Sequence, residues 1–201
     1  MIFKELDSFE SQNADMLAVH RAQEQMTYYL RRAFGTSDEV DVLSGLRLSS
    51  GDIRAQIDHL LLHPYGMVIV DCQSVLGGLQ VRSDGKWLRW RNSSMVEMPS
   101  PIDRVFFQAA ALKQFLEKKV KQPGFFSRVE VAVMVAVPDK GTIEWPPTGA
   151  LSVVCNADQI PARVAQRVLD YERQTSGPGA LALNHRRRLA EFLQASHKPL
   201  T

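Results

Sequence analysis

The sequence predicts an α/β protein in which a central mixed β-sheet is flanked by helices. A segment with helical periodicity over residues 16–34 precedes apolar strands between residues 40 and 73. A second long helix, over 102–120, precedes a buried strand over 128–137. Helices and strands that alternate in this way bury their apolar sides against one another in layers, so one sheet with helices packed on it is expected.

The composition is that of an ordinary globular domain. The 201 residues are 45% apolar and 23% charged, which suits one domain with a sizeable core. The net charge of +2 permits a nucleic-acid partner without indicating one. No apolar run reaches the ~18 residues of a membrane span, so no membrane partner is expected. The acidic first residues predict no secretion signal, and the distant Cys72 and Cys155 are expected to be free thiols of a cytoplasmic protein.

The N-terminal half is expected to form a helix and three strands. Residues 1–15 form a polar lead, and the helix over 16–34 ends at Gly35. One helical stripe contains Val19, Ala22, Met26, Tyr29, Leu30 and Ala33. A first strand over 40–48 is joined by a turn at 49–52 to the hairpin over 56–73.

The C-terminal half begins with a second hairpin over 78–90, whose tight turn is Asp84-Gly85. Pro99 and Pro101 introduce the helix over 102–120, with Ser100 or Asp103 available as its cap. The later elements are expected to be a strand over 128–137, a short strand over 151–155, a helix from Asp158 to about Tyr171 and a last helix over 183–196. The expected units are a lead (1–15), a main domain (16–173), a linker (174–182) that contains SGPG, and a basic helix with its tail (183–201).

The first hairpin, QIDHLLLHPYGMVIVDCQ (56–73), carries an aspartate in each apolar arm. A type I turn that pairs His63 with Gly66 puts Asp58 opposite Asp71. The same register puts Gln56 opposite Gln73, and strict alternation puts all four polar side chains on one face. A bulge at Gly66 would shift the pairing by one residue and leave the carboxylates as neighbours.

Two opposed carboxylates in an apolar hairpin destabilise the fold unless something relieves their repulsion. One of them can hold its proton, a lysine or arginine can lie between them, or a divalent cation can bridge them. Carboxylate oxygens are hard ligands that suit Mg²⁺ or Mn²⁺. In the alternative interpretation each aspartate bonds separately, to backbone or to an arginine such as Arg54.

At these residues the chain resembles the nuclease-related domain (NERD) family, a branch of the PD-(D/E)XK nuclease superfamily. The resemblance rests on the hairpin, on the helix HRAQEQMTYYLRRAF before it, and on the later segments PSPIDRVFFQAAALKQFL and VAVMVAVPDKGTIEWP. It covers roughly residues 16 to 172 and implies the PD-(D/E)XK core, in which helices flank a mixed sheet.

The resemblance also implies a catalytic site. Asp58 and Asp71 match the acidic pair that binds Mg²⁺ in the superfamily, and Cys72 would offer its backbone carbonyl. Gln73 stands where a lysine is expected to activate the attacking water, and Gln56 is a further candidate to position that water. A glutamine brings no charge to the transition state, so weak activity is expected.

Other positions are candidate helpers. A glutamate is common on the family's first helix, and here Gln23 suits the edge that faces the site while Glu24 lies toward solvent. Arg104 stands where the family favours a glutamine, and Gln108 follows one turn later. Lys140, at the end of a strand, is a candidate to supply the missing cation.

Two groups of cations are candidates for nucleic-acid binding. Lys86, Arg89 and Arg91 are interleaved with Trp87 and Trp90, a pattern that suits a phosphate backbone or an ordinary amphipathic strand. The densest basic run contains Arg186, Arg187 and Arg188, which suits phosphate contacts or a solvated helix face. His59 is expected to be a hydrogen-bonded sheet residue rather than a base.

The resemblance and these patterns leave three functions open. The first, which the resemblance implies, is a Mg²⁺- or Mn²⁺-dependent DNA endonuclease or nicking enzyme, weak because of Gln73, which works as a homodimer or in a larger DNA-processing assembly. The second is a catalytically degenerate module that binds nucleic acid or a partner protein. The third is a structural role in which arginines neutralise the acidic pair.

Overall fold

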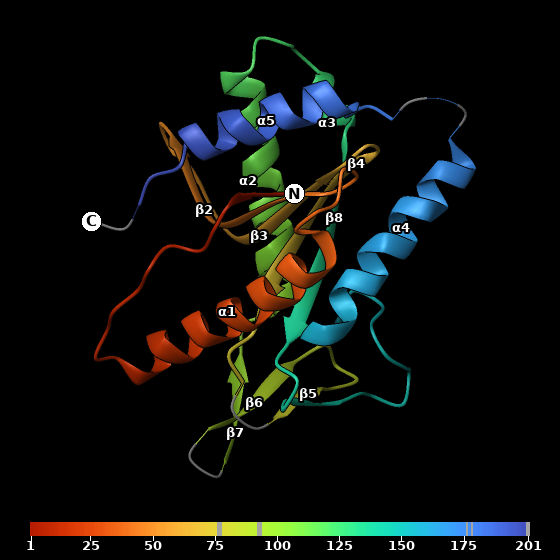
Figure 1. Cartoon of the computed structure of the whole chain (residues 1–201). Helices are drawn as coiled ribbons and strands as arrows, with labels where there is room; N and C mark the ends of the chain where they lie inside the picture. Colours follow the sequence, from red (N-terminus) through yellow and green to blue (C-terminus); the bar gives the residue numbers. More distant parts are fainter. Residues whose placement is uncertain (76–77, 92–93, 176, 178, 200–201) are drawn as a thin grey trace.

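A six-stranded mixed sheet forms the centre of the protein, as the computed structural model shows (Figure 1). The structure describes residues 1–75, 78–91, 94–175, 177 and 179–199. The strands, in spatial order, are β1 (Ile2–Lys4), β2 (Asp41–Ser50), β3 (Ile53–His63), β4 (Gly66–Cys72), β8 (Glu130–Val137) and β10 (Val154–Asn156). β2, β3 and β4 are antiparallel, whereas β1, β8 and β10 each run parallel to a neighbour, so the predicted mixed sheet is confirmed.

Helices cover both faces of this sheet (Figure 1). α1 (Ala14–Phe34) and α4 (Ile160–Gln174) pack on one face, and α4 is preceded by the short 3₁₀ helix η1 (Ala157–Gln159). The other face is covered by α2 (Pro101–Lys119), α3 (Phe125–Arg128) and α5 (Leu183–Ala195). The side chains form two separate apolar clusters, one on each side, and the strands of the sheet contribute to both. The predicted α/β class is therefore confirmed.

The helix termini follow their sequence signals. Asn13 caps α1 by accepting hydrogen bonds from the backbone N–H groups of Asp15 and Met16, and Ser100 caps α2 through the N–H of Asp103. On α1, Ala22, Met26 and Leu30 are buried as expected. Val19 and Ala33 are exposed, so the buried stripe is narrower than the periodicity predicts.

A second, four-stranded sheet projects from the end of the main sheet at which β4 and β8 end (Figure 1). Its strands are β7 (Ser94–Met98), β6 (Trp87–Arg91), β5 (Gly78–Val81) and β9 (Thr142–Glu144). The predicted hairpin is confirmed as β5 and β6, with Gly85 at a φ of 83° in the turn. The sequence did not predict β7 and β9, which are short and largely exposed.

Several boundaries differ from those expected. Residues 1–15 are not wholly irregular, because β1 joins the main sheet, and the strand expected over 151–155 begins at Val154. Asp158 makes no side-chain cap, since η1 carries the chain into α4. α5 adds Leu189 and Leu193 to the main core rather than standing apart. Positions 176 and 178 of the expected linker lie outside the described residues, as do the last two residues of the tail.

The main sheet contains one irregularity that positions an aspartate. Leu43, Leu46 and Leu48 of β2 lie in the same core cluster, which strict alternation does not allow. The alternation of side chains breaks at Gly45, whose φ is 61°, and at Asp58 opposite it on β3, while the pairing register of the two strands is the same on either side. Glycine adopts this left-handed backbone most readily, so the sequence places the irregularity here.

Candidate active site

The hairpin of β3 and β4 opens at the end that carries the two aspartates. The predicted register is confirmed from the His63–Gly66 pair to the His59–Val70 pair, where the recorded pairing ends. Beyond it, the Asp58 carboxylate enters the ladder, because its Oδ2 accepts a hydrogen bond of 2.8 Å from the Cys72 N–H. The carboxylate takes the place of a backbone carbonyl.

Asp58 is also held by α1. Gln23 Nε2 donates a 2.7 Å hydrogen bond to Asp58 Oδ1, so Gln23 lies on the helix edge that faces the hairpin. Glu24 is exposed, and its Oε1 lies 3.4 Å from His20 Nε2. Both Asp58 oxygens therefore have donors, one from a helix and one from the neighbouring strand.

Asp71 is held from the opposite side, by α2. Its Oδ1 accepts from an Arg104 guanidinium N–H, and its Oδ2 accepts from Gln73 Nε2. The Asp71 side chain is 8% exposed, whereas that of Arg104 is 54% exposed. The expectation that four polar side chains share one face is wrong, because Asp58 faces α1 and Asp71 faces α2. The break in side-chain alternation at Gly45 and Asp58 is the reason.

The two carboxylates interact electrostatically across the open end of the hairpin. Burial and the negative charge of Asp58 raise the pKa of Asp71 to about 6, although Arg104 opposes the shift. Burial also raises the pKa of Asp58, against the stabilising N–H of Cys72. Burial lowers the pKa of Arg104, but the charges of Asp71 and Asp58 outweigh this and raise it overall. Because the Arg104 side chain is about half exposed, it relieves only part of the repulsion between Asp58 and Asp71.

The other expected members of the site lie at its edge. Gln56 is exposed, and its backbone N–H donates a 2.7 Å hydrogen bond to Gln108 Oε1. Gln73 is buried beyond the end of β4, where its N–H bonds to the Ala136 carbonyl, so the expected pairing of Gln56 with Gln73 is wrong. Gln108 contacts the hairpin backbone rather than a carboxylate.

The remaining candidates divide between structure and solvent. Lys140 is exposed in the turn between β8 and β9, and Arg54 bonds to the carbonyls of Gly51 and Ile53 rather than to an aspartate. His59 lies 2.9 Å from Ser44 Oγ, and burial lowers its pKa to about 3, so it is neutral. The thiol of Cys72 packs in the core cluster on the α1 side, and burial raises its pKa.

Most of the candidate nucleic-acid cations are already paired. Arg186 is 1% exposed and binds Asp41 at 2.7 Å, so its assignment to phosphate binding is wrong. The other ion pairs are Arg187 with Asp38, Lys86 with Glu97 and Arg91 with Asp15. Arg188 is exposed. Arg89 makes no ion pair among the described residues, and its Nε, like that of Arg187, is buried without a hydrogen-bond partner among them.

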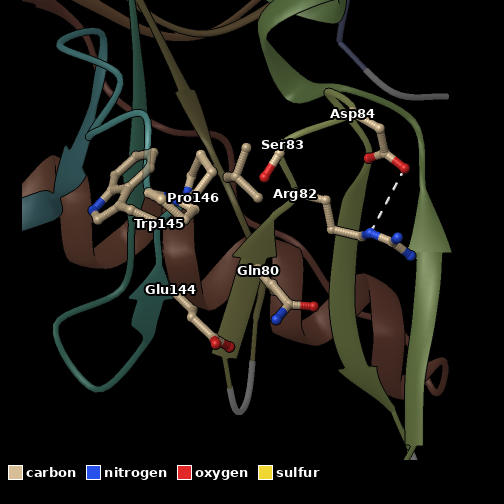
Figure 2. A pocket seen from close by; sticks show the side chains of 9 residues that line it. Gln80, Arg82, Ser83, Asp84, Glu144, Trp145 and Pro146 are labelled. Carbon is tan, nitrogen blue, oxygen red and sulfur yellow. Dashed lines mark ion pairs between the residues drawn. The ribbon is translucent and has the colours of Figure 1, made fainter.

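Cavities flank the carboxylates and also lie far from them. One of 610 Å³ is lined by Gln23, Gln56 and residues of the N-terminal segment, and one of 260 Å³ by Gln73, Arg89 and Arg104. Figure 2 shows another, on the second sheet, where Arg82 pairs with Asp84 beside Glu144 and Trp145. Neither Asp58 nor Asp71 lines any of these three cavities, but the first two are lined by residues that bond to them: Gln23 in one, and Gln73 and Arg104 in the other.

By residue type, the side chains at the hairpin are oxygen ligands of the kind that a hard cation takes: the carboxylates of Asp58 and Asp71 and the amides of Gln23 and Gln73 that bond to them. In this structure all four carboxylate oxygens accept hydrogen bonds, so a cation would have to displace some of these donors. Within the described residues, no group of three or more His, Cys, Asp or Glu gathers at one place. Two carboxylates with neutral oxygens suit an ion such as Mg²⁺, which retains several waters, better than Zn²⁺.

The fold and the hairpin define a class: a PD-(D/E)XK-like α/β core with an acidic pair at the open end of its first hairpin. The family model of the nuclease-related domain, NERD, matches residues 18–135, which is more than half of the chain. The protein belongs to this family. No curated protein and no solved structure matches the chain. None of the helices in the described ranges has the length and hydropathy needed to cross a membrane.

The sequence left two features of the site unidentified. The first is Gly45, which sets the direction of Asp58, and its signal was a glycine inside a strand. The second is the bond between the Cys72 N–H and Asp58, which only the opened ladder creates. Arg104 was identified as a helper, but no sequence pattern indicated that its partner would be Asp71.

Proposed function

We propose that the protein is a divalent-metal-dependent deoxyribonuclease that nicks DNA at the open end of the β3–β4 hairpin. The observation that carries this proposal is the nearness of two buried carboxyls, Asp58 and Asp71: burial, together with the charge of Asp58, raises the pKa of Asp71 to about 6. Two carboxylates this close lower the stability of the fold, so their presence is explained better by cation binding than by a role in the core. Family membership supports the same function.

The residues of the chain have distinct roles in this proposal. Asp58 and Asp71 hold the cation, and Gln23 together with the Cys72 N–H fixes the direction of Asp58. Gln73 positions the attacking water with its amide, and Arg104 stabilises negative charge on the phosphate. When bound, Mg²⁺ or Mn²⁺ supplies positive charge that polarises the phosphodiester and acidifies water. The absence of a lysine at position 73 predicts slow turnover.

The proposal is tested by incubating supercoiled plasmid with the purified protein in Mn²⁺, Mg²⁺ or EDTA. Wild type should nick with either ion and not in EDTA. Asp58→Asn and Asp71→Asn should each lower the nicking rate by about 100-fold or more, since each removes a cation ligand. Glu172→Gln, which changes an exposed carboxylate on α4, is the matched control and should nick like wild type.

Two results would refute the nuclease assignment. One is a wild-type protein that does not nick under any of these conditions. The other is equal nicking by wild type and Asp71→Asn, which would identify a contaminating nuclease as the source of the activity.

A second function, a nucleic-acid-binding module that does not cut, is favoured by Gln73 and by the Arg104–Asp71 ion pair. In this alternative Arg104 takes the place of the metal. It predicts DNA affinity that falls steeply with salt and persists in EDTA, without nicking by wild type. It also predicts that Gln73→Lys, which restores the expected cation, introduces nicking.

A further inference from the structure

The cavity beside the acidic pair lies between the two sheets. It measures 260 Å³ and is lined by Gln73 and Ser74 after β4, Arg89 on β6, and Ser100 and Arg104 at the start of α2. Since a water occupies about 30 Å³ of liquid, this space takes a phosphodiester group with its neighbouring ester oxygens. The position matters, because Gln73 and Arg104 also contact Asp71.

Arg89 brings an unsatisfied cation to this cavity. Its Nε has no hydrogen-bond partner among the described residues, and no carboxylate within them lies at ion-pair distance. On the same strand and hairpin, Lys86 bonds to Glu97 at 2.9 Å and Arg91 to Asp15 at 2.7 Å. Three other described arginines also have a buried Nε without a partner, but each of them pairs with a carboxylate: Arg47 with Asp7, Arg167 with Glu130 and Arg187 with Asp38. A buried donor without an acceptor destabilises the fold, so Arg89, which has no such pair, calls for an anionic ligand.

Arg104 connects the cavity to the acidic pair. Its guanidinium bonds to Asp71 on one side and lines the cavity on the other, and its 54% exposure leaves it free to reorient. A cation bound by Asp58 and Asp71 would compete with Arg104 for Asp71. A phosphate in the cavity would attract the released guanidinium, and the N-terminal end of the α2 dipole adds to that attraction.

We infer that this cavity is a phosphodiester subsite for the nucleic-acid strand, with Arg89 as its fixed cation and Arg104 as a cation exchanged between Asp71 and the phosphate. The inference rests on the proposed function and specifies how its substrate is held. Cation and DNA then bind with positive cooperativity, because each favours the same displacement of Arg104. In this inference the second sheet contributes to DNA binding through Arg89 on β6.

The test is the affinity for a fluorescein-labelled DNA duplex, measured by anisotropy with Ca²⁺ or with EDTA so that cutting does not interfere. Arg89→Gln should raise the Kd about tenfold or more, the loss expected for a charge-assisted phosphate contact. It should also reduce the slope of log K against log salt by about one. Wild type should bind more tightly in Ca²⁺ than in EDTA, and Arg104→Gln should lose most of that difference.

The matched control is Arg82→Gln. Arg82 belongs to the same small sheet but lines the separate cavity of Figure 2, where it already pairs with Asp84 at 3.6 Å. This variant should bind DNA like wild type. Circular dichroism melting of all variants excludes unfolding as the cause of weak binding, and Arg89→Lys, which retains the charge without the planar fork, should show an intermediate Kd.

Several outcomes would overturn the inference. An Arg89→Gln variant with wild-type Kd and salt slope removes the subsite, yet the nuclease proposal would still stand on plasmid nicking and its loss in Asp71→Asn. Displacement of the duplex by inorganic phosphate at the concentration of DNA phosphates would assign the cavity to free phosphate. A wild-type protein that nicks nothing and binds no duplex would refute both proposals.

Discussion

At the scale of single residues, the carboxyl of Asp71 combines burial with a nearby like charge. Its pKa of about 6 lies above the ordinary value of 3.8, so the folded protein binds this proton more tightly than the unfolded chain does. The stabilisation from this group is complete below about pH 4 and is lost as the pH rises through about 6. An ionised Asp71 therefore lowers the stability of the folded protein at neutral pH.

Replacing this carboxyl should stabilise the protein in a pH-dependent way. Asp71→Asn should raise the free energy of unfolding by on the order of 2 kcal/mol at pH 7.5, because a neutral amide avoids both the burial of a charge and the repulsion from Asp58. The gain should shrink toward zero as the pH approaches 4. Urea unfolding at pH 5 and 7.5 measures this, with Glu172→Gln as the control. Destabilisation at both pH values would show that the bond to Arg104 outweighs the repulsion.

The same pKa predicts how cation binding depends on pH. A proton on Asp71 competes with the cation, so affinity for Mn²⁺ should be constant above about pH 7 and fall by up to tenfold per pH unit below about 6. Titration calorimetry with Mn²⁺ alone, at several pH values, gives the curve. A midpoint near 4, the ordinary value for aspartate, would contradict the electrostatic coupling of the two carboxyls.

Sequence reasoning reached some of these residues and missed others, for a physical reason. Asp58 and Asp71 were candidates because of the hairpin pattern and its resemblance to the NERD family, and helix periodicity placed Gln23 on the edge of α1 from which it bonds to Asp58. The contact between Arg104 and Asp71 joins two elements whose relative placement depends on packing, which neither strand register nor helix periodicity predicts. Arg186 was misjudged for the same reason, since the buried Asp41 lies 145 residues from it.

At the scale of elements, the break in side-chain alternation that β2 and β3 share at Gly45 and Asp58 determines which way the Asp58 side chain points. Without it, Asp58 would alternate with Leu60 and Leu62 and point into the core on the α2 side. With it, the carboxylate reaches Gln23 on α1 and the Cys72 N–H. Strict alternation was the wrong rule at this point, and the glycine in the middle of β2 was the available sign.

A substitution at this break tests its role. In Gly45→Ala, the new Cβ would lie 3.0 Å from Leu6 Cδ1, and the alanine would have to adopt the left-handed backbone of this position. We expect a loss of stability of about 1–2 kcal/mol together with loss of plasmid nicking. Gly85→Ala is the matched control, because Gly85 also has a positive φ but open space around it. Gly85→Ala should lose similar stability and retain nicking. Equal nicking by the two variants would show that the backbone conformation at Gly45 does not position the site.

At the scale of the whole molecule, a buried ion pair joins the C-terminal helix to the main sheet. Arg186 of α5 bonds to Asp41 at the start of β2 at 2.7 Å and also to the backbone carbonyl of Asp38. Neither side chain of the pair is more than 2% exposed. The C-terminal helix is therefore attached to the main sheet by an ion pair as well as by the apolar contacts of Leu189 and Leu193.

Breaking that pair should be costly. Arg186→Met should lower the free energy of unfolding by about 3–5 kcal/mol, because it leaves the buried Asp41 carboxylate with only the N-terminal ammonium group of Met1, 3.7 Å away. Arg188→Met, an exposed neighbour on the same helix, should change it by less than about 0.5 kcal/mol. Urea unfolding gives both values. Adding Asp41→Asn to Arg186→Met should recover part of the loss, and no recovery would indicate that packing rather than charge is responsible.

The bond between the Asp58 carboxylate and the Cys72 N–H has a practical consequence. That amide proton is shielded by a side chain whose ionisation and ligand occupancy change, unlike its neighbours within the ladder. Its NMR chemical shift and its exchange with deuterated solvent should respond to metal and to pH while the surrounding signals stay still. A single backbone resonance thus becomes an internal indicator of what the carboxylates hold, readable without any substrate.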